Sequence, residues 1–153
     1  MQERIVEILI HVLNEVQKSH RPIGEVDVSS LVQRGYTQEE IVTAFTWLQD
    51  RLKSDAAFLE ISSKQRAASF RVLHSAEKFV ISPEAFGYLL QLRQLNIISG
   101  NELELVIERC MLSGFEQLTL DDVKAVVTSV VFDMDRDVFG RGRMLFHPDG
   151  TVN

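Results

Sequence analysis

Apolar side chains recur every three or four positions over residues 2–19, which predicts an amphipathic first helix. The stripe expected to be buried consists of Ile5, Ile8, Leu9, Val12, Leu13 and Val16. The sequence Arg-Pro-Ile-Gly at 21–24 interrupts this pattern, because proline and glycine favour turns. The first helix should therefore end before residue 21.

Residues 27–52 have the pattern of two helices joined by a tight turn. The first is short, over 29–34, and Gly35 follows it where a helix often ends in left-handed backbone. Thr37 and Glu40 have the spacing of a capping box, which begins the second helix. Its apolar stripe consists of Ile41, Ala44, Phe45, Leu48 and Leu52. Trp47 lies off the centre of that stripe, so it either closes a seam with the following helices, which we favour, or anchors a partner.

Residues 58–61 and 69–73 alternate apolar and polar side chains and predict two strands of a β-hairpin with its tip at 62–68. Helices followed by a hairpin form the element order of a winged helix-turn-helix, a fold that usually binds DNA. A helix hairpin of the ubiquitin-associated type is the rival for residues 31–48, and that fold has no strands after it. The hairpin therefore discriminates between the two folds.

The second half of the chain predicts three more helices. One begins at Ser82-Pro83, with proline at the first helical position, and runs to about residue 95. A second covers 101–112, and a third covers 119–132, with Thr119 as its cap. The β-branched residues of the third leave a strand as an alternative. The expected fold is mostly α with a small β-hairpin: a winged-helix-like unit at 1–75, packed on a three-helix unit at 76–133, and a flexible tail at 134–153.

Composition restricts the partners and the compartment. The chain has 153 residues, a net charge of −6 and a pI of about 5.2, so bulk attraction to nucleic acid is absent. Cys110 is the one cysteine, which excludes an internal disulfide and favours a reducing cytoplasm. We identify no signal peptide and no apolar run of membrane-spanning length.

Two sets of side chains are candidates for binding. The outward positions of the helix after Gly35 predict a protein-binding face made of Glu39, Thr43, Thr46, Trp47 and Asp50. Acidic side chains there would oppose phosphates, whereas reading of bases favours Arg, Lys, Asn or Gln. The basic residues of the expected hairpin are candidate nucleic-acid contacts: Lys64, Arg66 and Arg71.

Catalytic and metal-binding motifs fail at specific positions. The acids of residues 133–137 are spaced as in a calcium loop, but Val138 and Met144 occupy the positions that need glycine and a bidentate acid. A solvated acidic linker is the better interpretation. The histidines lack metal-ligand spacing, and Cys110 lies on an apolar stripe, as a buried thiol would. With no nucleophile elbow or phosphate loop either, we predict a protein that is not an enzyme and uses no cofactor or metal.

Several segments together resemble one family. They are Leu-Val-Gln-Arg-Gly-Tyr at 31–36 with Ile41, Ala44 and Trp47-Leu48, Ser-Phe-Arg-Val at 69–72, Leu-Asn-Ile-Ile at 95–98, Glu-Leu-Val-Ile-Glu-Arg at 104–109, and Leu-Asp-Asp-Val-Lys-Ala-Val-Val at 120–127. The chain resembles the bacterial Smg protein family in these segments. The resemblance implies a small cytoplasmic protein without an established activity, whose gene often neighbours that of the DNA processing protein DprA.

Three functions are considered, and the third, an enzyme of unrecognised type, has no support in the sequence. The first is a non-enzymatic interaction or adaptor protein that serves DNA-processing or transcription machinery. The alternative is a nucleic-acid-binding protein that contacts phosphates through the hairpin.

We expect weak or no sequence-specific binding to duplex DNA, because the predicted recognition helix is acidic. Any binding should depend on Lys64, Arg66 and Arg71, and its affinity should fall steeply with salt, with a logarithmic slope of about −0.9 per phosphate contacted. Fluorescence anisotropy of labelled duplexes over a salt series measures both quantities. Tight, sequence-selective binding that survives moderate salt would contradict the charge argument.

Overall fold

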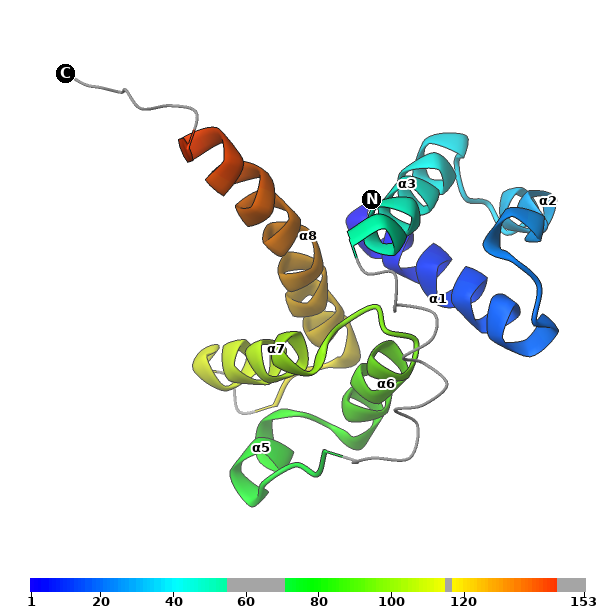
Figure 1. Ribbon diagram of the computed structural model, residues 1–153. Helices are drawn as coiled ribbons and strands as arrows, with labels where there is room; N and C mark the ends of the chain where they lie inside the picture. The colour runs from blue at the N-terminus through cyan, green and yellow to red at the C-terminus, as the bar shows by residue number, and fades with distance from the viewer. Residues whose placement is uncertain (55–70, 115–116, 146–153) are drawn as a thin grey trace.

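The computed structural model describes residues 1–54, 71–114 and 117–145, and the side chains of these residues up to 132, Ser54 excepted. The described part is helical (Figure 1). Its elements are α1 (Gln2–Ser19), the 3-10 turn η1 (Ile23–Glu25), α2 (Val28–Gln33), α3 (Gln38–Ser54), α5 (Ser75–Val80), α6 (Pro83–Gln94), α7 (Gly100–Leu112) and α8 (Leu120–Leu145).

Helix α1 lies between the two halves of the chain. It packs on α3 and η1 on one side and on α8 on the other. Its buried positions are Ile5, Val6, Ile8, Leu9, Val12 and Leu13. Full burial of one large aliphatic side chain contributes about 1.5–3 kcal/mol. The predicted stripe of this helix is confirmed, with Val16 only half-buried at its end, and the buried residues of both halves form one hydrophobic cluster.

Local capping sets the geometry of the helix-turn-helix formed by α2 and α3. The Asp27 carboxylate accepts a hydrogen bond from the Ser29 amide and caps α2. Gly35 has a φ of +90°, which a side chain would strain. Thr37 and Glu40 exchange two hydrogen bonds, Thr37 N to Glu40 Oε2 at 2.8 Å and Glu40 N to Thr37 Oγ1 at 3.2 Å. The predicted capping box is therefore confirmed.

The C-terminal helices begin at polar caps. The Ser82 hydroxyl accepts from the Ala85 amide ahead of α6, and Thr119 and Asp122 cap α8 in the same reciprocal way as the box at α3. Helix α8 continues to Leu145, past the end predicted from the sequence. A single parallel bridge links Ile81 with Leu118 and ties the chain after α5 to the chain before α8.

The predicted fold class was wrong in its β-hairpin. The described residues hold helices, one 3-10 turn and the isolated bridge, but no strand, so a winged helix is not supported. The first predicted strand, and residues 69–70 of the second, lie outside the described residues. Leu73 is buried while Val72 is 70% exposed. This alternation arises because an extended segment passes over the core, which needs no partner strand. The division at residues 75 and 133 stays a prediction.

Trp47 is 8% exposed and belongs to the hydrophobic cluster. We expect Trp47→Ala to destabilise the protein by about 3–5 kcal/mol, as large aromatic truncations in cores do. Urea unfolding of both proteins measures the difference. Val42→Ala, at an exposed position of the same helix, is the matched control and should change stability by less than about 0.5 kcal/mol. Unchanged stability of Trp47→Ala would contradict a core role.

Candidate protein-binding face

The outward side of α3 is fixed by contacts on its inward side. The Arg4 guanidinium on α1 donates from Nε to Glu40 Oε1 at 2.7 Å and from Nη2 to the Gly35 carbonyl at 2.6 Å. It also lies 5.1 Å from the centre of the Tyr36 ring. These contacts hold the turn between α2 and α3 against α1. The Thr37 amide and the Arg4 guanidinium keep the pKa of Glu40 below its ordinary value.

The α3 face comprises Glu39, Val42, Thr43, Thr46 and Asp50. All are exposed except Thr43, which is half-buried, and Val42 is 56% exposed. The hydroxyls of Thr43 and Thr46 donate to the helix carbonyls of Glu39 and Val42, both at 2.8 Å. A partner therefore meets methyl groups and acceptor lone pairs at these two positions, rather than free hydroxyl donors.

Two carboxylates stand at the ends of this face. Glu39 and Asp50 are separated by about 16 Å along the helix axis, from the rise of 1.5 Å per residue. Neither takes part in an ion pair within the described part of the chain. The face thus combines an exposed apolar side chain with negative charge that no ion pair among the described residues compensates.

Trp47 does not belong to the exposed face. The Arg51 guanidinium lies over its ring, 5.4 Å from the ring centre, and Arg51 Nη2 is 3.5 Å from Glu102 Oε2 on α7. Trp47 therefore lies near the contact between α3 and the first turn of α7. This placement agrees with the seam role and separates Trp47 from Glu39, Thr43, Thr46 and Asp50.

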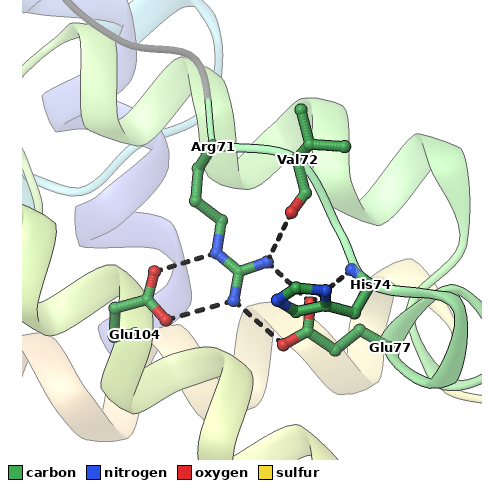
Figure 2. A network of polar contacts seen from close by, with 5 residues as sticks. All are labelled: Arg71, Val72, His74, Glu77 and Glu104. Carbon is green, nitrogen blue, oxygen red and sulfur yellow. Dashed lines mark hydrogen bonds and ion pairs between the residues drawn. The ribbon is translucent and has the colours of Figure 1, made fainter.

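Of the candidate nucleic-acid contacts, Lys64 and Arg66 lie outside the described residues, and Arg71 is fully engaged (Figure 2). Its Nη1 donates to Glu77 Oε2 at 2.6 Å and to the Val72 carbonyl at 3.0 Å. Its Nη2 donates to Glu77 Oε1 at 2.9 Å and to Glu104 Oε2 at 3.1 Å. Its Nε donates to Glu104 Oε1 at 2.8 Å. All five N–H groups of the guanidinium thus have acceptors, and a phosphate could bind only by displacing a carboxylate or the Val72 carbonyl.

The ion pairs of Arg71 change the titration of both partners. Hydrogen bonds from Arg71 lower the pKa of Glu77 to about 2 and also lower the pKa of Glu104. The same hydrogen bonds raise the pKa of Arg71. Sequence reasoning identified neither glutamate, because Glu104 lies 33 residues from Arg71 and no local spacing marks such a pair.

Other chemistry in the described residues is structural. No group of three His, Cys, Asp or Glu side chains among them could hold a metal ion. Cys110 is buried, and desolvation raises the pKa of its thiol to about 11, which keeps it protonated at neutral pH. The side chains of the acidic run at 133–137 lie outside the described set. Among the described helices, none is both long and apolar enough to cross a bilayer.

Comparison with known proteins identifies relatives. The model of the family described as "Protein of unknown function (DUF494)" matches residues 5–146. A protein named "Protein Smg homolog" from Xylella fastidiosa (strain M23) is 38% identical over 105 residues, which cover 69% of this chain and 65% of that protein. The proteins of the same name from Stenotrophomonas maltophilia (strain K279a) and Methylococcus capsulatus are 31% and 29% identical, over 87% and 94% of this chain and 85% and 92% of their own. No solved structure matches the chain.

The Glu77 carboxylate should contribute to acid sensitivity. Because its pKa falls from an ordinary 4.5 to about 2 on folding, its stabilisation is complete above pH 4.5 and is lost as the pH falls toward 2. Glu77→Gln should lower the free energy of unfolding at pH 7 by about 1.5–3 kcal/mol, the range for hydrogen bonds to charged groups. The variant should also lose less stability between pH 5 and pH 2 than the wild type does.

Urea unfolding at several pH values measures this difference. The control is Glu84→Gln, at an exposed position of α6, which should follow the wild-type pH curve. Parallel curves for the wild type and Glu77→Gln would show that the Arg71 pair does not stabilise the folded state.

Proposed function

The chain belongs to the bacterial Smg family, described as a family of unknown function (DUF494), and we propose that it is a non-enzymatic adaptor that binds a protein partner on the α3 face. The partner under this proposal belongs to DNA-processing or transcription machinery, and the gene context that the resemblance implies agrees with the first of these. What the whole protein does and which partners it binds are likewise proposed.

The observation that carries the proposal is the composition of the α3 face. Val42 is exposed between Glu39 and Asp50, whose carboxylates the described part of the fold leaves unpaired. The neighbouring threonine hydroxyls are hydrogen-bonded within the helix. A partner would therefore gain apolar contact and ion pairs without competing for hydroxyl donors.

Rigidity of α3 also supports docking. The buried residues Ile41, Ala44 and Leu48 hold the opposite side of the helix in the core, and Arg4 fixes its first turn. A surface that is already ordered loses little conformational entropy on binding, so more of the contact energy appears as affinity.

The nucleic-acid alternative has less support. The guanidinium of Arg71 is saturated by Glu77, Glu104 and the Val72 carbonyl. The α3 face presents carboxylates, which repel phosphate. We therefore retain protein binding as the proposed function.

Affinity capture from the source bacterium, with nuclease treatment of the lysate, tests the proposal. We expect Glu39→Lys/Asp50→Lys to lower recovery of the specific partner about tenfold or more, because facing like charges cost several kcal/mol across an interface. Glu84→Lys/Asp121→Lys makes the same charge change at exposed positions of α6 and α8 and should keep the partner.

Two results would contradict the proposal. One is equal recovery by the α3-face variant and the control. The other is loss of every captured protein on nuclease treatment, which would indicate that nucleic acid bridges the contact.

A further inference from the structure

The first two turns of α7 contact arginines from two distant parts of the chain. Arg51 comes from the last turns of α3, and Arg71 stands at the start of the segment that leads into α5. Arg51 meets Glu102, and Arg71 meets Glu104. The two acceptors are two residues apart on one helix.

Helix geometry places these acceptors on different sides of α7. Successive residues rotate by about 100°, so positions two apart lie about 200° apart around the axis. The two arginines therefore approach α7 from nearly opposite directions. In Figure 1, α5 is drawn below α7, and α3 lies above and to the right of it, beyond α8. The α5 helix packs directly on α7.

We infer that Arg51 and Arg71 clamp the first two turns of α7 from two sides, and that the clamp couples the helix-turn-helix, through Arg51, to the C-terminal helices, through Arg71. The α7 clamp is defined by Arg51, Arg71, Glu102 and Glu104. It concerns how the halves of the molecule are held together, and it does not depend on partner binding at the α3 face.

Burial of Glu102 makes the Arg51 side of the clamp sensitive to loss of its ion pair. Glu102 is 7% exposed, and its Oε2 also accepts from the Ser99 amide at 2.6 Å, in the capping box that begins α7. A buried carboxylate that loses its cationic partner is strongly destabilising. Any shift of Arg51 is therefore transmitted to the cap of α7, and equally to the Trp47 ring beneath the guanidinium.

The Arg71 side is the more tightly bonded one. Arg71 joins Glu104 to Glu77 through two paired contacts, with the shortest at 2.6 Å, whereas Arg51 and Glu102 are 3.5 Å apart. Glu77 in turn accepts from the His74 amide at 2.9 Å (Figure 2). The Arg71 side thus fixes the start of α5 as well as the second turn of α7.

A clamp predicts that its two sides depend on each other. If a substitution removes one ion pair, the start of α7 can move, and the remaining ion pair loses its geometry. The second substitution should then lower the free energy of unfolding by less than it does in the wild-type background. Two independent ion pairs would give additive costs.

A double-mutant cycle with Glu102→Gln and Glu104→Gln distinguishes these cases. Glutamine removes the charge but keeps an acceptor for the Ser99 amide, so the cap of α7 is preserved. We expect the unfolding equilibrium constant of the double variant to differ by about threefold or more from the value obtained by multiplying the changes of the two single variants, as for residues that share one network. The matched cycle of Glu102→Gln with Glu108→Gln, an exposed acid of the same helix, should be additive.

Trp47 supplies a second measurement, because it is the chain's one tryptophan. Acrylamide quenching of its fluorescence should rise in Glu104→Gln, since release of the Arg71 side loosens the contact of Arg51 with α7. Glu108→Gln should leave quenching unchanged. If Glu102→Gln does not fold, Arg51→Lys replaces it in the cycle, because lysine keeps the charge but lacks the planar fork. Additive costs in the 102–104 cycle, or unchanged quenching in Glu104→Gln, would overturn the inference.

Discussion

Burial of α1 on two sides is the constraint on which the rest of the structure depends. Ile8, Leu9 and Val12 are fully enclosed, and the helix packs on both α3 and α8. Since α1 contacts both halves of the chain, neither half completes its core without it. The same packing decides which side of α3 faces inward, so it also decides which residues form the α3 face.

Arginine side chains add ion pairs and hydrogen bonds to this hydrophobic core, and they determine which acidic side chains keep an unpaired charge at the surface. Glu40, Glu77 and Glu102 are each held by an arginine, at Arg4, Arg71 and Arg51 respectively. Arginine suits this role because its planar fork can satisfy a carboxylate and a carbonyl at once, as Arg4 and Arg71 do. Cations used in this way offer little to an outside anion. The net charge of −6 is therefore expressed on the surface by acids such as Glu39 and Asp50.

Local signals in the sequence predicted local structure, and distant contacts were not predictable from it. The boxes at Thr37 and Thr119 mark helix starts because their hydrogen bonds span three residues. The pairing of Arg71 with Glu104 has no such mark, so Arg71 looked like a free cation of a hairpin. The short helix α5 was missed, since its six residues are too few for the apolar spacing to repeat. For the candidate site, helical spacing predicted that Glu39, Thr46 and Asp50 point outward, but it also placed Trp47 on that face, where the structure buries the ring under Arg51.

The charges on α3 favour the proposed protein docking over insertion into a DNA groove. A duplex placed against the α3 face would bring phosphates within a Debye length, about 8 Å at physiological ionic strength, of Glu39 and Asp50. The described part of the chain gives these carboxylates no ion-pair partner to offset that repulsion. Basic side chains of a protein partner would reverse the sign of the interaction, and Val42 would gain apolar contact that a phosphate backbone cannot supply. Under the proposed function, α3 thus buries its inner side in the core and offers on its outer side an exposed valine between two carboxylates, which suits a basic protein surface.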